Sequence, residues 1–355
     1  MIALDVRACT VPTDRPESDG TLEWDATTIV VVEARHGGRR GLGYTYGPAA
    51  AGVLVRDQLA EVVADRDPLD VPGAWDAMVV AVRNAVPTGL AMYAVAAVDV
   101  ALWDLKARLL DVSLSRLLGR RREVIGIYGS GGFTSYSVGE LCEQVSAWVA
   151  AGIPAVKMKV GRDAHADPQR VRAAREAIGP DAELMVDANG AWAAGEAVAM
   201  AQRFADHGVS WFEEPVSSDD VAGLRQVRRR APAGMAIAAG EYATEVHAFR
   251  RLLGAVDVLQ ADVTRCGITG MLRADALCAA FDMPLSAHCA PALSAHVMVA
   301  LARARHIEYF HDHVRLESLL FDGVPQPDGG VLRPDPATAG HGLELKRRQA
   351  ERYGT

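Results

Sequence analysis

Short apolar runs alternate with amphipathic stretches from about residue 124 onward, and eight of these runs are candidates for β-strands. Most of them are separated by an amphipathic stretch such as EAVAMAQRFADHG. The eight runs are VIGIYG, PAVKMKV, ELMVDA, VSWFEE, MAIAAGE, VDVLQAD, MPLSAH and IEYFHD. Strands that alternate with helices pair in parallel through crossover connections. Eight such units predict a closed (β/α)₈ barrel.

An open, doubly wound sheet is the competing α/β arrangement. A dinucleotide-binding sheet of this kind carries a GxGxxG motif directly after its first strand, and none follows the first strand here. The pattern therefore favours an α/β protein built on a modified, TIM-like (β/α)₈ barrel.

The first third of the chain has a different pattern, which is typical of an α+β domain. MIALDVRACTV, TTIVVVEAR and GLGYTY resemble strands, and the turn-rich HGGRR between the last two predicts a hairpin. Helical stretches follow near residues 48–65 and 88–110, the second with Thr88 as its N-cap. The many alanines of the second stretch predict a buried helix that packs closely against a neighbour.

The change of pattern divides the chain into three segments. Residues 1–120 form the α+β domain, residues 121–315 the barrel, and residues 316–355 a tail. The tail contains PQPDGG and RPDPATAGHG, which are too irregular for another barrel unit. We expect it to pack back onto the N-terminal domain.

Composition and charge exclude several classes of protein. Half of the residues are hydrophobic and 23% are charged, as in a folded globular chain. The net charge of −8 gives no reason to expect nucleic acid or an anionic membrane as a partner. The five cysteines are odd in number and form no CxxC pair, which argues against a disulfide framework. With no signal peptide and no apolar stretch of about 18 residues, we expect a cytoplasmic protein without a membrane span.

Three carboxylates follow successive barrel strands. Asp187 ends ELMVD, Glu213 ends VSWFE, and Glu241 follows MAIAAG. Acids that converge at one barrel mouth repel each other unless a cation lies between them. Oxygen ligands without Cys or His suit Mg²⁺. The alternative is that each acid caps the following helix; Glu214, adjacent to Glu213, is expected to point elsewhere.

The run PAVKMKV places Lys157 and Lys159 on one face of a strand, because side chains alternate along it. A buried ammonium is strongly disfavoured, so two lysines that face a barrel interior indicate a function. Their mutual repulsion and a nearby divalent cation predict a lowered pKa for each, which suits one of them to act as a base. The alternative is an exposed strand whose lysines reach solvent.

Asp262 and His288 end the sixth and seventh runs, VDVLQAD and MPLSAH. Neighbouring strand ends bring the two within hydrogen-bond reach, so that the carboxylate orients the imidazole and raises its basicity. Taken alone, a His at a strand end is more often a structural hydrogen-bonding residue. Glu308, within the eighth run, is a candidate electrophile, although an ordinary strand glutamate explains its spacing nearly as well.

These residues together resemble the enolase superfamily, and specifically its mandelate racemase subgroup. The similarity covers the whole barrel, and the N-terminal third resembles the α+β capping domain of that family. The matching segments are KMK at 157–159, VDANGAW at 186–192, WFEEP at 211–215, AAGE at 238–241, QADVTRCGITG at 260–270, SAH at 286–288 and IE at 307–308.

The resemblance implies a role for each residue. Asp187, Glu213 and Glu241 match the ligands of Mg²⁺. Lys159 matches the base on one face of the substrate, and His288, supported by Asp262, the base or acid on the other. Glu308 matches an acidic hydrogen-bond donor to the substrate carboxylate, and Lys157 and Asn189 lie near that carboxylate. Arg265 departs from the pattern, because many relatives carry Lys there.

The implied reaction is removal of the proton alpha to a carboxylate through a stabilised ene-diolate. Dehydration of an acid sugar to a 2-keto-3-deoxy acid ranks first. A racemase or epimerase, a lactone cycloisomerase, and a non-catalytic barrel that binds metal or a sugar acid are the alternatives. The resemblance also implies a homo-oligomer.

In the family, a segment like residues 10–25 here closes over the barrel mouth. Its Asp14, Arg15, Glu17 and Asp19 favour a small hydroxylated carboxylate as substrate, although a solvated loop is the alternative. Tyr44 and Tyr46 are further candidates for this surface.

Overall fold

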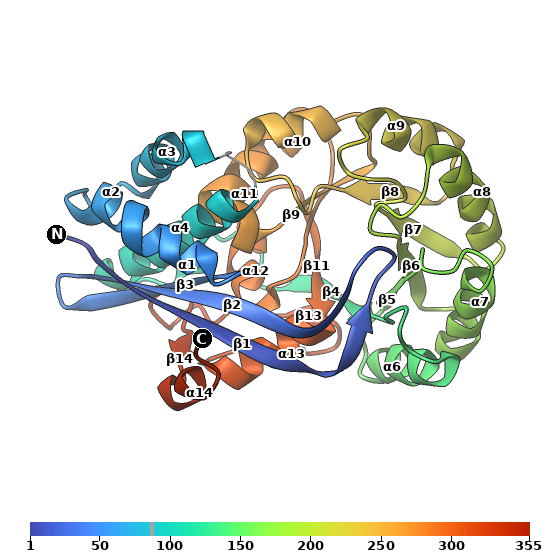
Figure 1. Ribbon diagram of the computed structural model, residues 1–355, viewed down its shortest axis with the longest axis horizontal. Helices are drawn as coiled ribbons and strands as arrows, with labels where there is room; N and C mark the ends of the chain where they lie inside the picture. Colours follow the sequence, from blue (N-terminus) through green and yellow to red (C-terminus); the bar gives the residue numbers. More distant parts are fainter. Residues whose placement is uncertain (86–88) are drawn as a thin grey trace.

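The computed structural model describes residues 1–85 and 89–355, which fold into a barrel with an N-terminal α+β domain beside it (Figure 1). All eight apolar runs form parallel strands, which confirms the predicted (β/α)₈ barrel. The strands pair in chain order from β4 to β11, and β11 closes the ring by pairing with β4. They are β4 (Ile125–Gly131), β5 (Ala155–Lys159), β6 (Glu183–Asp187), β7 (Val209–Glu213), β8 (Ala236–Ala239), β9 (Val258–Ala261), β10 (Leu285–Ala287) and β11 (Ala304–Phe310).

A helix follows each barrel strand. The helices are α6 (Val138–Ala150), α7 (Asp167–Ile178), α8 (Ala194–Ala205), α9 (Val221–Arg230), α10 (Val246–Leu252), α11 (Val263–Ala280), α12 (Pro291–Met298) and α13 (His311–Leu320). The amphipathic pattern of α8 buries one side of the helix, including Met200 and Phe204. Because all strands are parallel, their C-terminal ends meet at one rim of the barrel. The predicted strand-end residues therefore share that rim.

An antiparallel sheet opens the chain, and its three strands match those predicted from the sequence. The strands are β1 (Ala3–Ser18), β2 (Glu23–His36) and β3 (Arg39–Tyr46), paired in chain order. The hairpin predicted at HGGRR joins β2 to β3. Gly37 and Gly38 occupy its turn with φ of 56° and 73°, which a residue with a side chain rarely adopts.

The helices of this domain follow the prediction in part. They are α1 (Ala50–Leu54), the π-helical turn η1 (Val55–Leu59), α2 (Ala60–Ala64), α3 (Val71–Ala81), the 3₁₀ turn η2 (Arg83–Ala85), α4 (Leu90–Leu109) and α5 (Leu114–Leu117). The stretch near 48–65 forms α1, η1 and α2 in succession, and α4 occupies the second predicted stretch. The predicted N-cap of that stretch, Thr88, lies outside the described residues. The pattern did not predict α3.

Helix α4 is buried as its alanine content predicts, and it joins the sheet to the barrel. On one side it packs closely against β3, where a Cβ on Gly43 would lie 2.3 Å from the carbonyl oxygen of Ala97. On the other side it contacts α11, and Trp103 of α4 donates a hydrogen bond to Thr269 at 3.0 Å. Asp99 accepts a bond from the same hydroxyl at 2.6 Å. The N-terminal domain is thereby fixed against the barrel.

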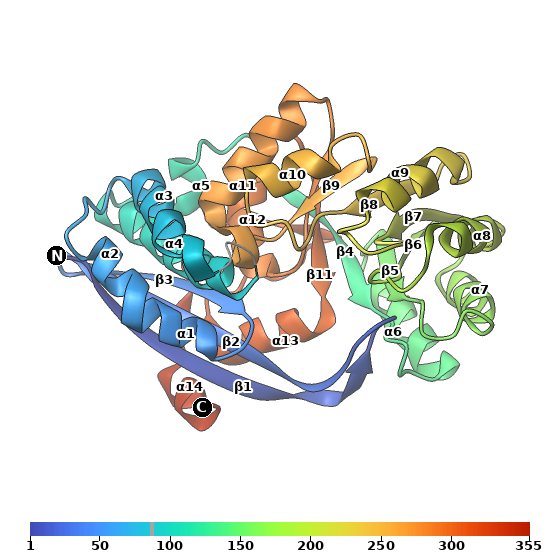
Figure 2. The ribbon, with the colours of Figure 1, turned by 45° about the horizontal axis from the view of Figure 1, so that its top comes forward.

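The tip of the β1–β2 hairpin reaches the barrel rim (Figure 2). The strand register shifts between Pro12 and Glu17 before the turn. The backbone N–H of Thr134 then donates to the carbonyl of Ser18 at 2.8 Å. At the tip, a Cβ on Gly20 would lie 2.5 Å from the carbonyl oxygen of Ala188, which follows β6. A glycine is therefore needed where the hairpin approaches the strand ends this closely.

The tail contacts both the barrel and the N-terminal sheet. Its elements are β12 (Phe321–Asp322), β13 (Val331–Leu332), β14 (Glu344–Leu345) and α14 (Arg347–Arg352). Strand β13 pairs antiparallel with β4, and β12 pairs with β14. The end of the chain lies against β1, where the N–H of Thr10 donates to the carbonyl of Tyr353 at 2.9 Å. None of the helices in the described ranges has both the length and the apolar character needed to cross a membrane.

Candidate active site

One cavity of about 600 Å³ lies between the barrel rim and the N-terminal domain. The strand ends form its floor, and the β1–β2 hairpin and the end of β3 form a wall. Its lining includes Lys159, Asn189, Glu241 and His288 from the barrel and Leu22 and Trp24 from the hairpin. Active sites of (β/α)₈ barrels lie at this rim, so the cavity is the candidate active site.

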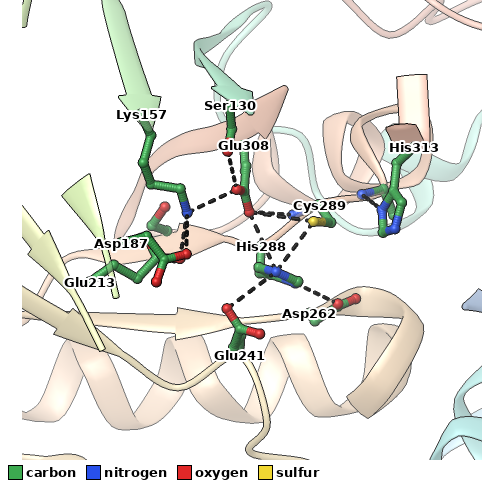
Figure 3. A network of polar contacts seen from close by, with 12 residues as sticks. Ser130, Lys157, Asp187, Glu213, Glu241, Asp262, His288, Cys289, Glu308 and His313 are labelled. Carbon is green, nitrogen blue, oxygen red and sulfur yellow. Dashed lines mark hydrogen bonds and ion pairs between the residues drawn. The ribbon is translucent and has the colours of Figure 1, made fainter. Parts of the chain in front are cut away.

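The three predicted metal ligands lie together. Asp187 and Glu213 end β6 and β7 and are paired in register, and Glu241 follows β8. Figure 3 shows the three side chains at the site. One carboxylate oxygen of each lies within 4.8 Å of the others, and all three side chains are buried. The structure therefore brings these acids into one cluster.

Carboxyl groups outnumber cations around this cluster. Six buried carboxyl groups face three permanent cations, Lys157, Lys159 and Arg265. The six are Asp187, Glu213, Glu214, Glu241, Asp262 and Glu308. Burial raises the pKa of Glu213 to about 8, because burial and the neighbouring carboxylates outweigh the attraction of Lys157. Oxygen Oε2 of Glu241 is buried without a hydrogen-bond partner. An all-oxygen donor set with an excess of negative charge and a free ligand atom fits Mg²⁺.

Glu214 does not join the metal cluster, as its place beside Glu213 predicts. Its φ of 37° turns the chain after β7, and the side chain is buried with one oxygen unpaired. Burial, with the charges of Glu241 and Asp187, raises the pKa of Glu214 well above its ordinary value. Glu214 therefore favours its neutral form here and supplies no ligand atom to the cluster.

Both lysines of β5 are buried and face the cluster, as the alternation of side chains predicts. Lys157 donates to Glu213 and lies 2.8 Å from Glu308. Lys159 donates to Asp187 at 2.5 Å. Each ammonium group is therefore paired with a carboxylate.

The expected lowering of the lysine pKa is not what this arrangement produces. Burial by itself lowers the pKa of Lys157 and Lys159, but the facing carboxylates raise both above the ordinary lysine range. The prediction considered the repulsion between the two lysines and a metal charge. It did not include the ion pairs with Glu213 and Asp187, which dominate here.

His288 and Asp262 form the predicted pair. Nδ1 of His288 lies 2.7 Å from Oδ2 of Asp262. The other oxygen of Asp262 accepts bonds from the N–H and hydroxyl of Thr264, both at 2.7 Å. Burial lowers the pKa of His288, but Glu241, Glu308 and the bond to Asp262 raise it above its ordinary value. The imidazole is therefore fixed in orientation, with Nε2 directed into the cavity.

Glu308 lies on β11 beside these groups, but its surroundings differ from those of an acidic donor. Its Oε1 accepts a hydrogen bond from the Ser130 hydroxyl at 2.6 Å. The same oxygen forms an ion pair with Nζ of Lys157 at 2.8 Å. Burial raises the pKa of Glu308, but Lys157 and His288 outweigh burial and hold that pKa well below its usual range. In this arrangement Glu308 accepts hydrogen bonds, because Lys157 is paired with it.

Arg265 connects the metal cluster to the His288–Asp262 pair. It donates to Oε1 of Glu241 at 3.0 Å, and its Nε lies 3.5 Å from Asp262. Its guanidinium also lies over the ring of Tyr242, 4.5 Å from the centroid. The planar fork reaches both acids, which a single lysine ammonium would do less well.

Of the three predicted substrate-contact residues Asn189, Tyr44 and Tyr46, two line the cavity and one does not. Asn189 lines the cavity, and its N–H donates to Asp187 at 2.9 Å. Tyr46 also lines the cavity and stacks on His313 with ring centroids 3.5 Å apart. Tyr44 is buried away from the cavity and donates to Glu317. The position of Tyr44 is therefore explained by packing of the hairpin, whereas Tyr46 lies at the cavity surface as predicted.

Of the polar residues of segment 10–25, only Asp19 lines the cavity. Asp14 pairs with His311, Arg15 with Glu140, and Glu17 is buried against Trp24. Leu22, Trp24, Tyr242, Phe310 and Cys289 also line the cavity and were not predicted. No motif marks them, because their position depends on where the hairpin and loops meet.

Both domains match known families. Residues 4–119 match the N-terminal domain of the mandelate racemase / muconate lactonizing enzyme family, and residues 140–350 match the enolase C-terminal domain-like family. Together these matches cover most of both the sheet domain and the barrel.

Two curated relatives are enzymes that act on sugar acids. The chain is 32% identical over 353 residues to a 3,6-anhydro-alpha-L-galactonate cycloisomerase of Streptomyces coelicolor, covering 97% of this chain and 96% of the relative. It is 31% identical to an L-talarate/galactarate dehydratase of Salmonella typhimurium, covering 79% of this chain and 73% of the relative.

Two solved structures have the same fold over nearly their full length. A mandelate racemase/muconate lactonizing enzyme-like protein from Rubrobacter xylanophilus is 57% identical, with a TM-score of 0.98 and 99% of each chain covered. A racemase from Streptomyces coelicolor with bound magnesium is 28% identical, with a TM-score of 0.94 and 100% of each chain covered. The family resemblance predicted from the motifs is thereby confirmed, and this chain belongs to the mandelate racemase / muconate lactonizing enzyme family of the enolase superfamily.

Proposed function

We propose that this protein is a Mg²⁺-dependent enzyme that removes the proton alpha to the carboxylate of a sugar acid and releases the oxygen on the neighbouring carbon. One observation carries the proposal. Three buried carboxylates form one cluster, and one of them, Glu241, lines the same cavity as Lys159 and the His288–Asp262 pair. Lys159 comes from β5 and His288 follows β10, strands that β4 and β11 separate in the ring. A substrate bound between them would meet a proton-transferring group from each side.

The carboxylates of Asp187, Glu213 and Glu241 would hold the metal ion. Bound Mg²⁺ supplies a Lewis-acid charge that stabilises the second negative charge of the ene-diolate. Lys157 would lie beside the substrate carboxylate and contribute a further positive charge. When Lys157 turns to the substrate, Glu308 loses the ion pair that lowers its pKa and becomes better suited to donate a proton.

Lys159 is the proposed base. Its ion pair with Asp187 holds the pKa of Lys159 high. Lys159 can therefore act as a base at neutral pH only when Asp187 also binds a second cation, which weakens this ion pair. His288 is the proposed acid, because Asp262 stabilises the imidazolium and directs its Nε2 toward the cavity.

In the dehydration that we rank first, Lys159 takes the proton from carbon 2. The electron pair is first held by the carboxylate as the ene-diolate, and it then forms the carbon 2–carbon 3 double bond as the carbon 3–oxygen bond breaks. His288 donates its proton to the departing hydroxyl, which leaves as water. The resulting enol loses the proton of its carbon 2 hydroxyl, takes a proton at carbon 3 and becomes the 2-keto-3-deoxy acid.

Cycloisomerisation is a second candidate, favoured by the full-length similarity to the Streptomyces coelicolor cycloisomerase. The same residues serve if the oxygen that leaves carbon 3 belongs to a ring. The ring then opens without loss of water, and the product is an isomer of the substrate. Racemisation would follow if carbon 2 were instead reprotonated on its opposite face.

The cavity also favours a substrate with one carboxylate. Its cationic lining residues, Lys159 and Arg265, both lie at the barrel rim among the acids. The hairpin wall presents Leu22, Trp24 and Asp19. A second carboxylate at that end would meet no positive charge among the lining residues described, and an unpaired charge in a cavity is unfavourable.

We therefore expect sugar monoacids to exceed the matching diacids in kcat/KM by about 10- to 100-fold, since an unpaired group costs about 1–3 kcal/mol. The measurement is a panel of mono- and dicarboxylic sugar acids with Mg²⁺, read by formation of the 2-keto product and by its mass. A product lighter by one water indicates dehydration, an unchanged mass with a new 2-keto group indicates ring opening, and an unchanged mass without that group indicates racemisation.

A substitution sharpens this test. Leu22→Arg places a cation at the hairpin wall and should raise the relative rate for diacids. The control is Leu69→Arg, because Leu69 is also an exposed leucine but lies outside the cavity. A parent enzyme that prefers diacids would contradict the assignment of substrate class.

A further inference from the structure

The thiol of Cys289 lines the cavity, is a group of metal-ligand type and has no role in the proposed reaction. Its Sγ lies 3.3 Å from Nε2 of His288 and 3.4 Å from Oε2 of Glu308. The imidazole and the carboxylate are themselves 3.5 Å apart. Figure 3 shows the three side chains converging from β11 and the segment after β10.

This triangle has the size of one face of a tetrahedral zinc site. Zinc binds sulfur at about 2.3 Å and nitrogen or oxygen at about 2.0–2.2 Å, so tetrahedral ligand atoms lie about 3.3–3.7 Å from each other. The three separations in the cavity differ from those values by no more than a few tenths of an ångström. Small side-chain shifts would therefore suffice for Cys289, His288 and Glu308 to bind one ion.

The surroundings orient the ligands as metal sites require. Asp262 accepts the bond from Nδ1 of His288, which leaves the Nε2 lone pair directed at the thiol. A carboxylate on the far nitrogen is the usual outer partner of a metal-binding histidine. The N–H of Cys289 donates to Glu308 at 3.3 Å, and the φ of 51° at Cys289 fixes the turn that carries the thiol.

A fourth ligand atom is close at hand. Oε2 of Glu241 lies 3.3 Å from Nε2 of His288 and is buried without a hydrogen-bond partner. The set of one sulfur, one nitrogen and carboxylate oxygens differs from the all-oxygen cluster of Asp187, Glu213 and Glu241. Thiolate and imidazole select zinc over magnesium, whereas carboxylates alone suit magnesium.

We propose that Cys289, His288 and Glu308 form a second metal site that takes Zn²⁺ and that its occupation inhibits the enzyme. Binding releases the thiol proton of Cys289 and, from the imidazolium, the Nε2 proton of His288 to solvent, and it leaves a zinc–thiolate bond. The ion would occupy Nε2 of His288, the atom that the proposed reaction needs for proton transfer. The inhibitory part of this inference rests on the proposed function, whereas the zinc binding does not.

The binding test uses the full-length protein in saturating Mg²⁺. Zinc affinity is measured by competition with a chromophoric chelator, and Co²⁺ is used as a spectroscopic substitute. We expect tight zinc binding and a thiolate-to-cobalt charge-transfer band. Cys289→Ser should lose the band and weaken zinc binding by more than about 100-fold, since losing even an outer partner costs 10- to 100-fold. The matched control is Cys142→Ser, a cysteine on α6 outside the cavity, which should bind like the parent.

A second variant tests whether zinc merely replaces magnesium in the carboxylate cluster. Asp187→Asn removes a ligand of the carboxylate cluster and should keep the cobalt–thiolate band. Circular dichroism confirms that each variant is folded, and Cys289→Ala serves in place of the serine variant if that one does not fold. Absence of the band in the parent, or unchanged zinc affinity in the folded Cys289 variant, would overturn the site.

The activity test compares each protein with its own zinc-free rate. Zinc should inhibit the parent, a chelator followed by Mg²⁺ should restore the rate, and Cys289→Ser should resist the same zinc concentration. Equal inhibition of both proteins would overturn the inhibitory role. An inactive parent with an intact cobalt–thiolate band would reject the proposed function and leave the zinc site standing.

Discussion

Lys159→Ala and His288→Ala are each expected to lower kcat by about 10²–10⁴-fold, the usual contribution of a positioned acid or base. Lys159 faces the cavity from β5, and His288 faces it from the segment after β10. Removing either leaves the metal cluster and the cavity in place, so substrate binding should change less than turnover. Steady-state kinetics on the substrate identified from the panel, with Mg²⁺ saturating, gives both constants.

The matched control for the lysine is Lys346→Ala, since Lys346 lies outside the cavity and its ammonium contacts the carbonyl of Ser318. Its kinetics should match those of the parent. Both catalytic variants should retain the parent's circular dichroism spectrum, which separates lost chemistry from lost folding. Full activity in the Lys159 and His288 variants would show that the assigned base and acid are wrong.

Removal of the metal ion, or of one of its proposed ligands, should have at least as large an effect. A bound cation contributes several kcal/mol to stabilising the charge that develops in the reaction, and each 1.4 kcal/mol is a factor of ten. We expect a chelator to lower the parent's rate by about 10³-fold and Mg²⁺ to restore it. Asp187→Asn should lose a similar factor in rate and should not recover with added Mg²⁺.

Glu183→Gln provides the control, because Glu183 begins the same strand that Asp187 ends. It lies at the opposite end of β6 and bonds to the hydroxyl of Ser210. Its activity and its response to the chelator should follow the parent. Activity that survives chelation, or an Asp187→Asn variant that Mg²⁺ rescues fully, would remove the carboxylate cluster from the mechanism.

The barrel could be predicted from the sequence because its strands are short, apolar and regularly spaced. Each parallel strand is buried on both faces, so it appears as a continuous apolar run. Helix α3 escaped prediction because Pro72 and Gly73 suggest a turn. In the structure Pro72 lies in the first helical turn, where proline is tolerated, and Asp70 caps the helix by accepting from Gly73.

The contact between His288 and Asp262 was also predictable, since neighbouring parallel strands place their ends side by side. The protonation states of the site residues were harder to predict from the sequence. The pKa of Lys159 and Glu308 depends on which carboxylate or ammonium each one meets, and strand order alone does not give those pairings. The contacts of Arg265 with Glu241 and Asp262 also could not be predicted from strand order.

The cavity wall was the least predictable part. Segment 10–25 is polar in sequence, but most of its charges pair outside the cavity. Leu22 and Trp24 line the cavity instead, because the hairpin turns at Gly20 over the barrel rim. The domain boundaries, the residue roles and homo-oligomerisation remain predictions.

The most direct test of the account follows the proton alpha to the carboxylate by nuclear magnetic resonance in deuterium oxide. With Mg²⁺, the parent should remove this proton, so that its signal disappears as the substrate exchanges or is converted. The signal should persist when a chelator is present or when Lys159 and His288 are both replaced by alanine. Loss of the signal at the parent's rate under either condition, or a product that retains the proton, would contradict the account.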